Sequence, residues 1–149
     1  MSDTPPQPVA APDPTPPAPT GTGLAPNVAA GLAAVFPLVG GIIFFVLEKK
    51  DKFVRFWAMQ SIFFGGLAFG ISIVLRVVAF VFGFLPFIGK LMLFLLLIVY
   101  PIFGLAWFVV WVIGIVKAFS GKEWEIPWLG KLARQQLEKI DGAATPPAS

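Results

Sequence analysis

Three long apolar segments constrain this chain more than any other feature of its sequence. They run over about residues 27–47, 53–76 and 90–117, with few charges inside them. A helix of about 20 residues crosses the roughly 30 Å hydrocarbon core of a bilayer. The chain is 57% hydrophobic and 13% charged, whereas a soluble domain carries about 25% charged residues. We therefore predict an all-α integral membrane protein with three transmembrane helices, and four as the alternative.

Helix-breaking residues divide these segments further. Pro37 and the Gly40-Gly41 pair lie inside the first segment, where a local kink is expected. Residues 77–89 are apolar but too short to cross again, so the second helix should end near Phe84 in a tight turn. A re-entrant hairpin at 77–89 is the alternative.

Arg76 interrupts the second segment. A helix rises about 31 Å from Arg55 to Arg76, which is close to the thickness of the hydrocarbon core. We therefore expect the Arg76 guanidinium at the opposite interface, reaching the lipid headgroups.

The chain divides into four regions. Residues 1–26 contain nine prolines and predict a disordered Pro/Ala-rich tail. Residues 27–119 form the transmembrane helical domain. In residues 120–141, apolar and charged side chains alternate at helical spacing, which predicts an amphipathic helix in the membrane interface. Residues 142–149 form a short tail.

The distribution of basic residues predicts the orientation. The 48–55 turn has four, and the chain from Lys117 onward has five, whereas Arg76 and Lys90 alone flank the 76–90 connection. Basic residues favour the cytoplasmic side. Three spans place both of the larger clusters of basic residues on the cytoplasmic side. The C-terminus is then cytoplasmic, and the N-terminal tail lies outside. A fourth span would move the C-terminal cluster outside.

Nothing in the sequence resembles an active site. Cysteine and histidine are absent, and no acidic residue lies inside an apolar segment. This removes the side chains most used for zinc binding and for proton transfer. We expect no enzymatic activity, no cofactor, no metal, no nucleic-acid partner and no small-molecule substrate.

Small and polar residues in the second segment are candidates for helix contacts. Gly66 and Gly70 form a GxxxG pattern, which lets helix backbones approach closely. The contact is expected within the chain, with a homodimer as the alternative. Gln60 and Ser61 are polar within an apolar span, and we expect Gln60 to hydrogen-bond a neighbouring helix.

A resemblance adds to this interpretation. The stretch Phe53-Val54-Arg55-Phe56-Trp57-Ala58-Met59-Gln60-Ser61 and the later Gly121-Lys122-Glu123-Trp124-Glu125-Ile126-Pro127-Trp128-Leu129-Gly130 resemble a bacterial family of small membrane proteins of unknown function. That family is similar to the Tic-twenty components of chloroplast protein import. Its motif has histidine where this chain has Trp57, so a role for an imidazole there is in doubt. Arg55, Phe56 and Gln60 match.

These observations favour a non-enzymatic scaffold or accessory subunit of the bacterial inner membrane that acts by helix–helix contacts. Membrane lipids and a homo-oligomer or other membrane proteins are the expected partners. The alternative, which the resemblance implies, is an oligomeric pore or translocation component. At the start of the second helix, Arg55 is expected to pair with lipid phosphate, Glu48 or Asp51. Phe56 and Trp57 are expected at headgroup depth.

Overall fold

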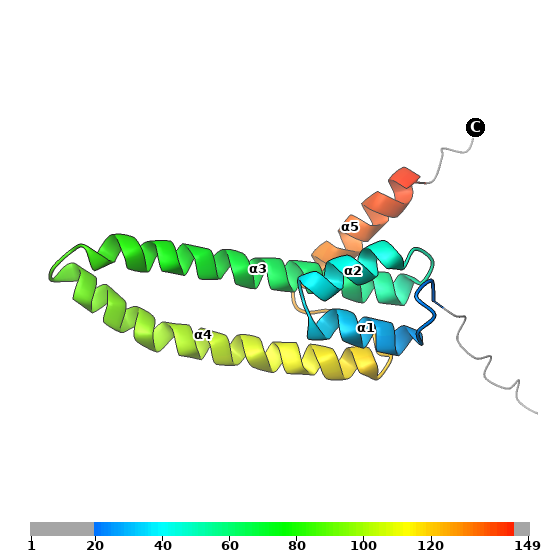
Figure 1. Ribbon diagram of the computed structural model, residues 1–149, viewed down its shortest axis with the longest axis horizontal. Helices are drawn as coiled ribbons and strands as arrows, with labels where there is room; N and C mark the ends of the chain where they lie inside the picture. The colour runs from blue at the N-terminus through cyan, green and yellow to red at the C-terminus, as the bar shows by residue number, and fades with distance from the viewer. Residues whose placement is uncertain (1–19, 145–149) are drawn as a thin grey trace, which may run out of the picture.

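The computed structural model describes residues 20–144, and within that range every regular element is a helix. The helices are α1 (Pro26–Val35), α2 (Val39–Leu47), α3 (Lys52–Gly83), α4 (Ile88–Phe119) and α5 (Leu129–Ala144) (Figure 1). The predicted all-α class is confirmed. Of the predicted tails 1–26 and 142–149, residues 1–19 and 145–149 lie outside the described range. Residues 20–25 form turns ahead of α1, Pro26 begins α1, and residues 142–144 continue α5.

Two long helices, α3 and α4, form an antiparallel hairpin (Figure 1). Each has 32 residues and is apolar enough to cross a membrane. At about 1.5 Å per residue each is about 48 Å long. Residues 84–87 connect them at what we call the tip, so the tight turn expected near Phe84 is confirmed. Pro101 lies inside α4, which curves along its length.

The first apolar segment folds differently from the single span that we expected. It breaks at residues 36–38 into α1 and α2, which run side by side in opposite directions (Figure 1). Pro37 lacks an N–H group and disfavours helical geometry in the residue before it. Phe36 accordingly leaves the helical region, with φ −112° and ψ 78°. The expected kink is therefore a reversal of the chain.

Hydrogen bonds confirm this reversal. The N–H of Gly21, ahead of α1, donates to the Glu48 carboxylate after α2 at 2.7 Å. The Asn27 side chain in α1 donates to the Phe119 carbonyl at the end of α4 at 3.0 Å. The start of α1 and the ends of α2 and α4 therefore lie together. We call this end of the molecule the head.

Three transmembrane helices are therefore not confirmed. Two helices in the described part of the chain are long enough to span, and α1 and α2 are a short helical pair beside them. α2 still exposes apolar side chains, with Ile42 48% and Val46 61% exposed. Such a surface suits lipid better than water. The pair thus fits a re-entrant hairpin that reaches part of the way across a bilayer.

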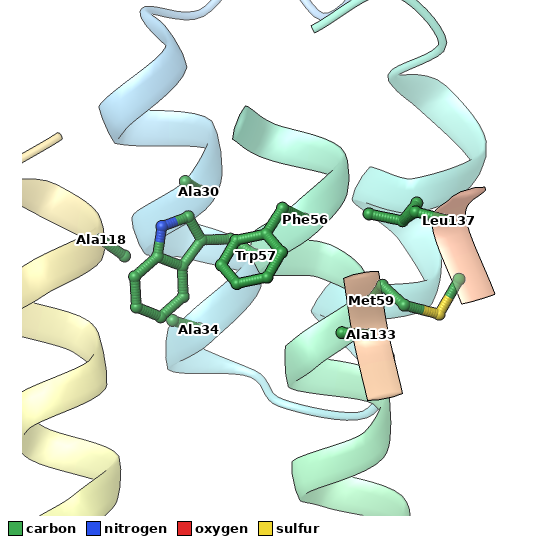
Figure 2. Packing of buried hydrophobic residues seen from close by; sticks show 8 residues of the cluster. All are labelled: Ala30, Ala34, Phe56, Trp57, Met59, Ala118, Ala133 and Leu137. Carbon is green, nitrogen blue, oxygen red and sulfur yellow. The ribbon is translucent and has the colours of Figure 1, made fainter. Parts of the chain in front are cut away.

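A buried cluster in the head holds the helices together (Figure 2). The Trp57 ring lies between Ala30 and Ala34 of α1 and Ala118 of α4. The alanines let the helices approach closely enough to enclose the indole. On the other side of α3, Phe56 and Met59 pack towards α5, which contributes Ala133 and Leu137.

The amphipathic helix predicted near the C-terminus is α5. Its N-terminal boundary is Leu129, after the extended loop 122–126 and a turn in which Trp128 has φ +67°. Ala133 and Leu137 are buried, whereas Lys131 and Lys139 on the opposite side are exposed. This pattern confirms the amphipathic character. The helix packs against α3.

Candidate functional site

The turn before α3 is organised by two carboxylates. Asp51 is the N-cap of α3, and its side chain accepts hydrogen bonds from Phe53 N–H at 2.8 Å and Val54 N–H at 3.1 Å. Glu48 is fully buried and accepts from the N–H groups of Lys50 and Asp51 as well as from Gly21. The Asp51 contacts satisfy N–H groups at the start of α3, and the Glu48 contacts satisfy N–H groups in the turns outside the helices.

The environment of Glu48 shifts its acidity. Burial removes water from the carboxylate, which by itself raises the pKa. Hydrogen bonds from the backbone of Asp51, Lys50, Gly21 and Thr22 together outweigh that effect, so the pKa of Glu48 lies below its ordinary value. Glu48 is therefore held as a charged anchor between the chain ahead of α1 and the turn into α3.

Arg55 does not pair with Glu48 or Asp51, the two side-chain partners that the sequence suggested. Its guanidinium forms an ion pair with Asp141 of α5 at 2.9 Å and donates to the Lys49 carbonyl at 3.3 Å. It also lies 5.1 Å from the centre of the Phe45 ring. The carboxylates of Glu48 and Asp51 bind backbone N–H groups instead. Arg55 thus connects the end of α5 to the start of α3.

Phe56 and Trp57 are buried, at 3% and 1% exposure. Neighbouring helices therefore cover both rings, and their expected position at headgroup depth stays a prediction. Phe56 supports Arg134 of α5, whose guanidinium lies 5.0 Å from the ring centre. A cation over an aromatic face is favoured electrostatically. The indole N–H of Trp57 has no hydrogen-bond partner among the described residues.

Gln60 is fully buried and bonds to the loop that follows α4. Its amide group donates to the Trp124 carbonyl at 3.1 Å, and its oxygen accepts from the Ile126 N–H at 3.2 Å. The expected partner was another helix, whereas the observed partner is loop backbone. An extended loop leaves its N–H and C=O groups unpaired, so it can use both ends of one amide side chain. Ser61, the next residue, is buried at 5% exposure.

Arg134 completes the contacts between α5 and the rest of the head. It bonds Glu125 through two nitrogens, at 2.9 and 2.6 Å, and lies 3.5 Å from Glu123. The hydrogen bonds that Arg134 donates to Glu125 are the largest cause that raises the pKa of Arg134. We call Arg55, Phe56, Gln60 and Arg134, with their partners, the clip, because they fasten the loop 120–128 and α5 to α3.

The glycines of α3 fall into two groups. A Cβ added at Gly65 would lie 2.7 Å from the Leu38 nitrogen, and one at Gly41 of α2 would lie 2.8 Å from the Ala58 carbonyl oxygen. These positions are close helix crossings. At Gly66 and Gly70 an added Cβ would meet nothing within 4 Å. The structure therefore leaves open space at the Cβ position of both glycines of the GxxxG pair, and Gly66 lines a hollow that α4 and Trp128 also line.

The chain matches the magnetosome magnetite crystal formation protein family over residues 22–133, which is most of its length. It belongs to that family. The matched region contains α1 to α4 and the first turn of α5, and therefore the head contacts of Glu48 and Gln60.

Curated relatives of this magnetosome-family protein come from archaea. It is 34% identical over 117 residues to a UPF0132 membrane protein of Methanocaldococcus jannaschii, covering 78% of this chain and 92% of the relative. It is 36% identical over 112 residues to a UPF0132 membrane protein of Archaeoglobus fulgidus, covering 74% and 94%. No solved structure matches the chain.

These findings place the chain in a membrane protein family of uncharacterised function. They support neither the expected Tic-twenty likeness nor a bacterial inner membrane, since the relatives are archaeal. They indicate no catalytic family. Within residues 20–144, no group of three or more acidic, His or Cys side chains is placed to hold a metal ion.

Several residues of the clip were not predicted as site residues. Arg134 was expected on the charged face of the interfacial amphipathic helix, and Asp141 was given no role. Arg134 pairs with Glu125, and Asp141 pairs with Arg55. Both pairs depend on the angle at which α5 leaves its loop, and the local sequence does not determine that angle. The signal that could have drawn attention to Glu125 and Arg134 is their separation of nine residues across a Pro-containing turn.

Proposed function

We propose that this protein is a non-enzymatic membrane scaffold or accessory subunit that acts by helix–helix contacts on α3. The observation that carries the proposal is the contrast between its glycines. Gly41 and Gly65 lie at close crossings inside the head, whereas Gly66 and Gly70 continue along α3 with an open face. Gly41 and Gly65 show that glycines of this chain serve close helix crossings, and Gly66 and Gly70 leave open space for another such crossing.

The forces that drive helix association in a bilayer support a helix contact at the Gly66 and Gly70 face. Helices in a bilayer gain little from the hydrophobic effect, so small residues that allow close backbone approach favour association. Leu67 and Val74 beside the glycines are 44% and 60% exposed. They can pack around a helix that lies across Gly66 and Gly70. The partner is a second copy or another membrane protein.

The clip gives the scaffold a fixed head. Ion pairs and the Gln60 bonds hold α5 on α3, and the exposed Lys131 and Lys139 lie on its free side. The basic clusters of the 48–55 turn and of the chain after Lys117 both belong to the head. The positive-inside rule therefore supports a cytoplasmic head, with the tip on the opposite side.

Two other functions have less support. A pore needs a polar path, and the side chains that line the space between α3 and α4 are apolar apart from Ser72, Arg76 and Tyr100. The family description speaks of magnetite crystal formation, whereas the archaeal relatives are named only as membrane proteins. The family name alone does not give this chain a mineral partner.

The test compares crosslinked partners in native membranes. The Gly66→Leu/Gly70→Leu variant should lose crosslinks that the unmodified chain forms, because two bulky side chains keep a second helix away. Gly83→Leu is the matched control, since Gly83 is also on α3 and its added Cβ also meets nothing within 4 Å. Unchanged crosslinks in the double variant would contradict the proposal.

A further inference from the structure

A continuous groove runs between α3 and α4 from the α1–α2 reversal towards the tip. Its inner part has a volume of about 380 Å³ and begins at Pro37 and Trp111. Its outer part has a volume of about 480 Å³ and includes Arg76. Leu75 and Tyr100 line both parts, so the two parts adjoin along the groove.

The inner end of the groove is well defined. Trp111 is fixed there because its indole N–H donates to the Ala34 carbonyl at 2.9 Å. Along the wall, the rings of Phe64 and Trp107 stack with their centres 4.3 Å apart. Most of the lining is aliphatic or aromatic. The groove therefore offers an apolar channel that stops at the bend of the re-entrant hairpin.

The length of the groove matches one leaflet. Along α3, the twelve steps from Phe64 to Arg76 correspond to a rise of about 18 Å. Half of the hydrocarbon core is about 15 Å. An extended acyl chain whose headgroup is level with Arg76 would thus end near Pro37. The re-entrant hairpin provides the floor at about mid-membrane depth.

The charge at the outer end fits a phosphate. Arg76 is exposed, and the sequence between Asp51 and Glu123 contains no acidic residue that could pair with it from α3 or α4. The planar guanidinium binds phosphate through two parallel hydrogen bonds. An apolar channel that ends in an arginine is complementary to a phospholipid, which has an apolar chain and an anionic phosphate.

We propose that the groove between α3 and α4 binds one acyl chain of a phospholipid from the leaflet on the tip side, with its phosphate at Arg76. The charge at the outer end favours a phospholipid over a helix of a second copy. Neither α3 nor α4 contains an acidic residue, so either helix of a second copy would leave the Arg76 guanidinium without an anionic partner.

The experiment uses the full-length protein in vesicles that contain a phosphatidylglycerol with a photoactivatable diazirine at the end of one acyl chain. After illumination, the crosslinked residues are identified by peptide mass spectrometry. Crosslinks should concentrate near Pro37, Phe64 and Trp111, at the inner end. Crosslinks spread evenly over the outer faces of α3 and α4, or no crosslinks at the inner end, would overturn the proposal.

Two variants on opposite walls test occupancy. An added Cβ at Gly104 meets nothing within 4 Å, so Gly104→Leu extends into the groove without striking backbone. Ala68→Leu narrows the groove from α3. Each should lose the inner crosslinks while eluting as a folded protein. Gly83→Leu, which lies outside the groove, should keep them. Retained crosslinks in both folded groove variants would overturn the proposal.

The headgroup contact is tested separately. Arg76→Gln should weaken retention of phosphatidylglycerol in native mass spectrometry about fivefold, as expected for one basic residue at a membrane surface. Lys90→Gln is the control, because Lys90 is also basic and near the tip but does not line the groove. If both substitutions weakened phosphatidylglycerol retention equally, the attraction would be a general one between basic residues and anionic lipid. Arg76 would then not be part of the binding site.

Discussion

Gln60 of α3 reaches across to the loop after α4, where its amide donates to the Trp124 carbonyl at 3.1 Å. Its oxygen accepts from the Ile126 N–H, so a single side chain pairs both a donor and an acceptor of an extended segment. An added Cβ at Gly130 would lie 2.8 Å from the same oxygen. The start of α5 is therefore packed directly against the bonded amide.

Replacing Gln60 with Leu should destabilise the head. The Trp124 carbonyl and the Ile126 N–H would lose their partners in a part-buried position, which costs about 1–3 kcal/mol. This exceeds the average of about 0.6 kcal/mol for a hydrogen bond between membrane helices. Thermal unfolding in detergent measures the change. Ser61→Ala, at a neighbouring buried position, is the control and should have a smaller effect.

Gly41 should not tolerate even a methyl group. An alanine Cβ there would lie 2.8 Å from the Ala58 carbonyl oxygen and 2.9 Å from the Ile62 side chain. Overpacking of this kind costs about 1–3 kcal/mol. Gly41→Ala should therefore unfold at a lower temperature in detergent than the unmodified chain. Gly70→Ala, where the added Cβ meets nothing within 4 Å, should unfold at an unchanged or slightly higher temperature.

The features that the sequence predicted correctly rest on local patterns. The apolar runs identified α3 and α4, the Gly and Pro residues of 83–89 placed the turn at the tip, and alternating polarity identified α5. The features that it did not predict depend on contacts between distant segments. Pro37 indicated a break but not its angle, which depends on how Gly40 and Gly41 pack against the neighbouring helices.

The residues of the candidate site show the same limit. Gln60 was identified because a buried amide in an apolar span needs partners, but those partners lie 64 and 66 residues away in a loop. Arg55 was expected to use nearby acids, which are already bound to backbone N–H groups. Its actual partner, Asp141, becomes available only when α5 folds back along α3.

The reversal between α1 and α2 predicts a specific labelling pattern. The chain has no cysteine, so single cysteines can be introduced at Ala25, Lys50 and Pro86, all of which are exposed. Positions 25 and 50 should react with an impermeant thiol reagent from one side of the membrane, and position 86 from the other. Three full spans would place position 25 with position 86 instead, and that result would contradict the re-entrant pair.

Glu48 should make the stability of the head sensitive to acid. Its pKa is lowered in the folded protein despite burial, because backbone N–H groups stabilise the carboxylate. A lowered pKa contributes stability that is complete above the ordinary value of 4.5 and declines as the pH falls through the folded value. The Glu48→Gln variant lacks this contribution, so it should be less stable than the unmodified chain at neutral pH. Below about pH 4.5 the difference should narrow.

Thermal unfolding in detergent between pH 7 and pH 3, for both proteins, measures this difference. Glu138→Gln is the control, because Glu138 is an exposed carboxylate on α5, and it should show a smaller difference at every pH. If the difference in stability between Glu48→Gln and the unmodified chain instead widened as the pH fell, the folded state would bind the Glu48 proton more tightly than the unfolded state. The carboxylate would then not be the charged anchor that its hydrogen bonds to Gly21, Lys50 and Asp51 indicate.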